Sequence, residues 1–258
     1  MDRVMHSITT LGAAIKHIWQ DRKEKYPRVI CWGTILLAFA AALISARLLC
    51  GIVEISLFRL LLSHGSNGHT AALLAYMAQV VLIYDLTLIL TVGAGLRLLG
   101  LTLDEIGWKK PDSIIRILAS VICMVAFVFL GGIFVSLLRH GSFHGYTIAP
   151  SESLRNLGFA SAYITLFVKV FNAPIEELFY RGFLQTALNK HLHASWTIVL
   201  TASFFAVAHL ESNKSITQVF IAGLIYSILR KWGNTLWNPI AAHLTKNSIA
   251  SYVSITFQ

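Results

Sequence analysis

The segment from Ile114 to Leu138 reads IIRILASVICMVAFVFLGGIFVSLL and decides the class of fold. A helix that crosses about 30 Å of hydrocarbon needs about 20 mostly apolar residues, and this segment supplies them. The whole chain has the same character, because 56% of its 258 residues are hydrophobic and only 13% are charged. Soluble domains carry roughly 25% charged residues. The composition therefore argues against a single soluble domain and against disorder, and it predicts a polytopic membrane protein.

Apolar segments of helical length recur along the chain and predict an all-α fold with about seven transmembrane helices, six or eight being the alternatives. From first to last, the expected spans cover residues 29–49, 71–96, 114–138, 158–188, 196–210, 216–229 and 236–257. The segment 52–62 is too short to span a bilayer and carries Glu54 and Arg59, so we expect it to be interfacial or re-entrant. Residues 29–258 would thus form a single membrane domain.

The segment 1–28, before the first span, combines basic residues with apolar residues at helical spacing, such as Ile8, Leu11 and Ile15. This pattern predicts an amphipathic helix on an anionic leaflet, with a solvated tail as the alternative. No secretory signal peptide is expected, because the first apolar run starts only near Val29 and is too long for one.

The net charge of +9 is distributed unevenly over the expected loops. Lys and Arg gather before the first span, after the second and after the sixth, whereas the loop after the first span has none. By the positive-inside rule this alternation places the N-terminus in the cytoplasm. The basic residues are then explained by the orientation of the chain in the membrane and by contact with the lipid bilayer. Nucleic acid is therefore excluded as a partner. The short loops favour a prokaryotic plasma membrane, or an endoplasmic reticulum membrane if the chain is eukaryotic.

The fourth predicted span contains ionisable residues in the stretch Phe171-Asn-Ala-Pro-Ile-Glu-Glu-Leu-Phe-Tyr-Arg181. A charged residue inside a transmembrane helix costs about 2.5 kcal/mol or more, so it indicates a functional site. Glu177 and Arg181 have the i, i+4 spacing that lets them pair along one helix face. Glu176 is rotated by about 100° from Glu177, so it is free to face a cavity.

Three later polar residues are expected at a similar depth. His209 ends an apolar run in the fifth span, and His243 and Asn247 share a helix face in the seventh. Measured from a turn near residue 193, Glu176 and His209 lie about 26 Å and about 24 Å along their helices. Together these side chains could supply a general base, a proton shuttle and donors to an oxyanion. For Asp85, in the second span, we expect an interhelical hydrogen bond.

The chain resembles the CPBP family of CAAX-processing and bacteriocin-processing intramembrane proteases, also called Abi proteins. The resemblance rests on the ordered motifs Glu176-Glu177-x-x-x-Arg181, Phe205-x-x-x-His209 and His243-x-x-x-Asn247. The stretch Leu103-Asp-Glu-Ile-Gly107-Trp-Lys-Lys-Pro111 also resembles an upstream Gly-x-x-x-Pro signature of many members. The resemblance covers about residues 101–251, which would be the peptidase core, with the catalytic residues on the last four helices.

This resemblance implies an intramembrane endopeptidase that cleaves a membrane-associated, lipidated or leader-bearing peptide. In such an enzyme Glu176 would activate the attacking water and His209 would be its partner. His243 and Asn247 would polarise the scissile carbonyl and stabilise its oxyanion. Glu177 and Arg181 would support the site electrostatically.

Three alternatives stay open at this point. Glu176, His209 and His243 have the composition of a catalytic zinc site, although the HExxH pattern is absent and an Asn suits an oxyanion donor better. The chain could instead be a non-catalytic immunity or regulatory scaffold that binds a membrane protein partner. It could also be a transporter or channel that uses Glu176 and His209 as a proton relay, although an internal repeat that would favour one is not found.

Overall fold

The computed structural model describes residues 27–44, 50–65, 68–111, 113–150, 166–210 and 215–257. Nearly all of the amphipathic segment expected over residues 1–28 lies outside these ranges. The described chain is mainly helical, as the apolar pattern predicts. The labelled helices are α2 (Pro27–Ile44), α3 (Cys50–Ser63), α4 (Gly68–Ala78), η2 (Gln79–Asp85), α5 (Leu86–Leu99), α6 (Ile114–His140), η3 (Leu178–Leu184), α8 (Gln185–Asn189), α9 (Ala194–Val207), α10 (Ile216–Gly233) and α11 (Trp237–Tyr252).

Two of these elements, η2 and η3, are π-helical turns within longer helices. The first joins α4 to α5, and the second joins the helical residues 166–177 to α8. Such π-helical turns are rare and are frequently found at functional sites, because their wider turn changes which side chains share a face. The positions of η2 and η3 therefore indicate a functional site near these two turns.

The described chain also contains a two-stranded antiparallel ribbon of β1 (Tyr146–Pro150) and β2 (Val253–Phe257), with Tyr146 opposite Phe257. The expectation that the last span continues as helix to residue 257 is therefore wrong, whereas the all-α fold class is confirmed. Helix α11 ends at Tyr252. The following residues, Val-Ser-Ile-Thr-Phe, are mostly β-branched or aromatic and pair readily with a partner strand.

One helix of the described part, Ile114–Leu138, is long and apolar enough to cross a membrane. Only 11% of its most apolar 18-residue stretch is buried inside the protein. Its apolar side chains therefore lie at the surface, which suits contact with lipid. Two shorter apolar helices are Trp32–Ala41 and Ala194–Val207. The count of seven spans stays a prediction.

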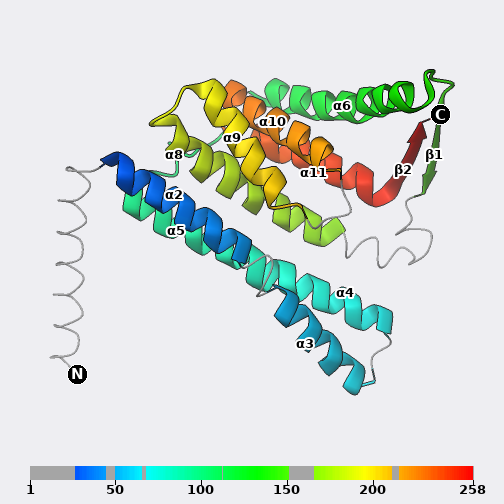
Figure 1. Ribbon diagram of the computed structural model, residues 1–258, viewed down its shortest axis with the longest axis horizontal. Coiled ribbons are helices and arrows are strands. Elements are labelled where there is room, and N and C mark those ends of the chain that lie inside the picture. Colours follow the sequence, from blue (N-terminus) through cyan, green and yellow to red (C-terminus); the bar gives the residue numbers. More distant parts are fainter. Residues whose placement is uncertain are drawn as a thin grey trace.

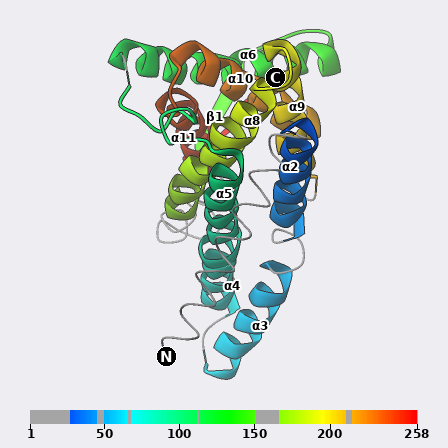
Figure 2. The same ribbon diagram turned by 90° about the vertical axis from the view of Figure 1, so that its left-hand side faces the viewer.

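The helices form two connected groups (Figure 1). In the first, α2 lies beside α5 and α3 beside α4, so that the α3–α4 hairpin extends away from the rest. In the second, α9 packs on α10, and α11 packs on both α10 and α6. Figure 2 shows α6 crossing obliquely over α10 and α11. The segment η3 contacts α5, α9 and α10, so it joins the two groups.

The core of the described chain is centred on η3. Its side chains Phe179, Tyr180, Phe183 and Leu184 are fully buried. Gly95 of α5 lies against the ring of Phe183, where a larger residue would collide with it. This close packing fixes the helix that carries Glu176 and Glu177 against its neighbours.

Candidate active site

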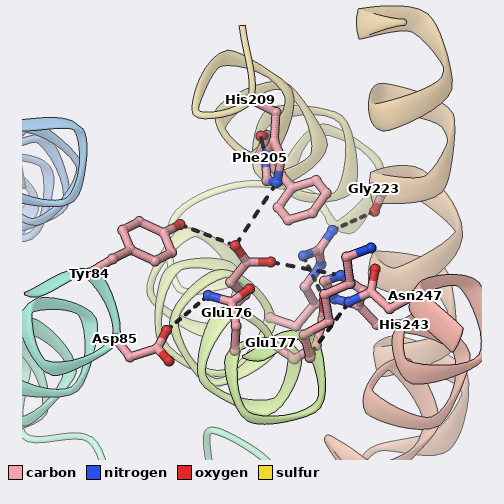
Figure 3. A network of polar contacts seen from close by, with 12 residues as sticks. Tyr84, Asp85, Glu176, Glu177, Phe205, His209, Gly223, His243 and Asn247 are labelled. Carbon is pink, nitrogen blue, oxygen red and sulfur yellow. Dashed lines mark hydrogen bonds and ion pairs between the residues drawn. The ribbon is translucent and has the colours of Figure 1, made fainter. Parts of the chain in front are cut away.

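Glu176 lies near the end of the helical residues 166–177, and its carboxylate is buried between three other elements (Figure 3). Its Oε1 lies 4.0 Å from Nε2 of His209, just after the end of α9, and its Oε2 lies 3.7 Å from Nε2 of His243 in α11. Oε1 also accepts a hydrogen bond from the hydroxyl of Tyr84 in η2, at 3.3 Å. One carboxylate thus faces two imidazoles and a phenol.

Glu177, the next residue, has different neighbours. Its Oε1 lies 3.1 Å from Nη1 of Arg181, and both side chains are fully buried. The second guanidinium nitrogen, Nη2, donates to the carbonyl oxygen of Gly223 in α10, at 3.1 Å. The guanidinium also lies over the rings of Phe205 and Tyr226, at 4.5 Å and 5.1 Å from their centroids. The charge of Arg181 is therefore balanced by Glu177, and the flat face of its guanidinium is covered by aromatic rings.

His243 is held by contacts on two sides. Its Nδ1 lies 2.8 Å from Oε1 of Glu177, and its ring stacks on that of Tyr226 at a centroid distance of 4.8 Å. His209 is held in a comparable way, because its Nδ1 lies 2.8 Å from the carbonyl oxygen of Phe205. These contacts orient both imidazoles with Nε2 toward Glu176.

The partners of the two histidines assign their tautomers. A backbone carbonyl and an ionised carboxylate can only accept hydrogen bonds, so Nδ1 of His209 and Nδ1 of His243 carry the protons. In the neutral rings, each Nε2 then offers a lone pair toward Glu176. The carboxylate and the two Nε2 atoms are all acceptors in this state, and together they suit a ligand with O–H donors, such as a water molecule.

Asn247 lies one turn beyond His243 on α11, but its amide points elsewhere. Its Nδ2 donates to the carbonyl oxygen of Lys169, at 3.5 Å. The structure therefore brings Glu176, Glu177, Arg181, His209 and His243 into one connected set of contacts and places Asn247 at its border.

Residues that the sequence analysis did not select also contribute. Tyr84 contacts Glu176 directly, and Tyr226 and Gly223 support His243 and Arg181. The signal for Tyr84 was the polar pair Tyr84-Asp85 within an apolar run. The interhelical hydrogen bond expected for Asp85 is confirmed, because Nδ2 of Asn172 donates to its Oδ1 at 2.8 Å.

The sequence also allows Glu176, His209 and His243 to be zinc ligands. Glu176, His209 and His243 are neighbours, but within the described ranges no group of three or more His, Cys, Asp or Glu side chains is placed to hold a metal ion. The carboxylate of Glu177 is taken up by Arg181 and His243.

A buried carboxylate beside two oriented imidazoles, on the helices of a largely apolar chain, is typical of a functional site. Residues 158–249 match the family model described as type II CAAX prenyl endopeptidase Rce1-like. This segment carries the three motifs that contain Glu176, His209 and His243 but not the Gly107-x-x-x-Pro111 signature, so the resemblance to the CAAX proteases is confirmed over a little more than a third of the chain. The comparisons with curated proteins and with solved structures each gave no match. By its description, this family model represents endopeptidases.

Proposed function

We propose that the chain is an intramembrane endopeptidase in which Glu176 activates a water molecule. The observation that carries this proposal is the difference between two adjacent carboxylates. Glu177 is bound by Arg181 at 3.1 Å, whereas Glu176 faces two Nε2 atoms at 3.7 Å and 4.0 Å. A carboxylate without so close a guanidinium partner is the better base, because a permanent ion pair stabilises the charged form.

The proposed reaction begins with a water molecule between Glu176 and the two imidazoles. Glu176 takes one proton from the water, and the water oxygen attacks the carbonyl carbon of the scissile peptide bond. The carbonyl oxygen becomes an oxyanion. Glu176 then gives its proton to the peptide nitrogen, the C–N bond breaks, and the products are a carboxylic acid and an amine.

His243 and Asn247 are proposed to stabilise the oxyanion. His243 would be a donor at Nε2 in its imidazolium form, which takes its second proton from solvent before the reaction and keeps it throughout, and Glu177 supports this imidazolium through Nδ1, at 2.8 Å. Asn247 would exchange its 3.5 Å hydrogen bond to Lys169 for one to the substrate. His209 would orient the water through its own Nε2. A donor aimed at a developing oxyanion contributes about 2.7–4 kcal/mol to catalysis in well-studied hydrolases.

The proposed substrate is a membrane-anchored peptide, either lipidated near its C-terminus or carrying a leader. Prenylated tails are the class named by the matching family model. A cytoplasmic N-terminus, as the charge distribution predicts, would place the loop between α5 and α6 on the cytoplasmic side.

The test compares membranes that contain the wild-type chain with membranes that contain Glu176→Ala. Mass spectrometry of their peptides should show products that only the wild type makes, together with uncut precursors in the variant. Asp104→Asn, an exposed carboxylate in the loop before α6, is the control and should behave as the wild type. Equal expression with retained cleavage by Glu176→Ala would contradict the proposal. Loss of activity with a chelator and its return with zinc would contradict a mechanism without metal.

A further inference from the structure

Two neighbouring residues of η2 contact two consecutive turns of the helix that carries Glu176 (Figure 3). Tyr84 donates to Oε1 of Glu176 at 3.3 Å, and Asp85 accepts from Asn172 at 2.8 Å. Asn172 and Glu176 are one turn apart on the same helix. The segment η2 is therefore attached to this helix at the catalytic carboxylate and again one turn before it.

The hydrogen bond from Tyr84 limits the orientation of the carboxylate. The terminal torsion of a glutamate is broad and roughly two-fold, so an unbound carboxylate rotates easily. A phenol that holds Oε1 leaves Oε2 directed at Nε2 of His243, 3.7 Å away. The rest of η2 is held in place by Asp85, which is itself 2% exposed.

We propose that Tyr84 is a positioning residue for Glu176: it fixes one carboxylate oxygen so that the other is directed at the water and His243. This inference rests on the proposed function, because it assigns Tyr84 a role in the same reaction. Tyr84 lies outside the segment 158–249 that matches the family model. The site is thus completed by η2, which lies in the first helical group of this chain, and the peptidase core depends on η2 for its activity.

The kinetic test uses Tyr84→Phe, which removes only the hydroxyl group. A small misplacement of a catalytic group costs up to about 100-fold in rate, so we expect kcat to fall roughly 10- to 100-fold while KM changes little. Tyr252→Phe, at the end of α11, makes the same chemical change away from Glu176 and should keep kcat. A purely structural role would instead lower the melting temperature of Tyr84→Phe and leave kcat unchanged, which would overturn the proposal.

A second test needs no turnover. Melting temperatures in detergent are compared for wild type, Tyr84→Phe, Glu176→Ala and the double variant. Groups in contact are expected to couple, so Tyr84→Phe should shift the melting temperature less when Glu176 is already removed. Equal shifts in both backgrounds would overturn the contact. If coupling is found but the wild type cleaves no peptide, the proposed function fails while the contact stands, so the two failures are distinguishable.

Discussion

Arg181 forms its ion pair with Glu177, at 3.1 Å, and not with Glu176, the carboxylate that directly precedes Glu177 on the same helix. Consecutive helical residues point about 100° apart, so one guanidinium does not serve both carboxylates equally. Arg181 also extends to the carbonyl of Gly223, which ties the pair to α10. We therefore expect the Glu177–Arg181 pair to support the fold, while Glu176 faces His209 and His243.

Replacing Arg181 with Met should destabilise the protein strongly. The change leaves the charge of Glu177 buried without its partner, which typically costs about 3–5 kcal/mol. Thermal unfolding in detergent micelles would measure the loss. The double variant Glu177→Gln/Arg181→Met removes both charges and should lose clearly less than the sum of the two single variants. Additive losses would show that the two side chains do not depend on each other.

Gly223 should be sensitive to the addition of a side chain, because α9 approaches α10 closely at this point. A Cβ atom there would lie 3.2 Å from both Cα and Cβ of Ala202, and backbone atoms cannot move aside cheaply. We expect Gly223→Ala to cost about 1–3 kcal/mol of unfolding free energy, as overpacking does. Gly93→Ala, in α5, is the matched control, since nothing lies within 4 Å of its Cβ position. A Gly223→Ala variant with the same melting temperature as the wild type would contradict this close packing.

The sequence was sufficient for the Glu177–Arg181 pair, because helical spacing alone decides which residues share a face. It was also sufficient to place Glu176 and His209 near one another, because depth along antiparallel helices follows from rise per residue. Tyr84 and Glu176 are 92 residues apart in sequence, and their contact depends on how their two helices pack. No local sequence pattern predicts such a contact. The strand after Tyr252 was missed because hydropathy counts apolar residues without distinguishing strand formers from helix formers.

Gly107, the first residue of the Gly-x-x-x-Pro signature, should be sensitive for two reasons. Its φ of +84° is unfavourable for other residues, and a Cβ would lie 2.6 Å from the guanidinium carbon of Arg230. Gly65 has a similar φ of +81° with nothing within 4 Å, so Gly65→Ala measures the backbone cost alone, about 1–2 kcal/mol. We expect Gly107→Ala to lower the melting temperature further than Gly65→Ala. Equal effects would mean that Arg230 moves aside freely.

Glu105, in the same loop, should make stability depend on pH in the acid range. The backbone N–H and the hydroxyl of Thr102 donate to its Oε2 at 2.7 Å and 3.1 Å, and Nζ of Lys190 lies 3.6 Å from its Oε1. The hydrogen bond from the Thr102 backbone, followed by that from its hydroxyl, lowers the pKa of Glu105 below its ordinary value of 4.5. The unfolded chain therefore takes up this proton at a higher pH than the folded chain.

The contribution of Glu105 to stability is consequently complete above pH 4.5 and is lost as the pH falls through the lower pKa of the folded state. The melting temperature of Glu105→Gln should be lower than that of the wild type at pH 7. The difference between the two melting temperatures should shrink as the pH is lowered from 4.5. Asp104→Asn removes a neighbouring carboxylate and controls for the general loss of negative charge in this loop. A gap between Glu105→Gln and wild type that stays constant down to acid pH would show that the Thr102 hydrogen bonds do not depend on the charge of Glu105.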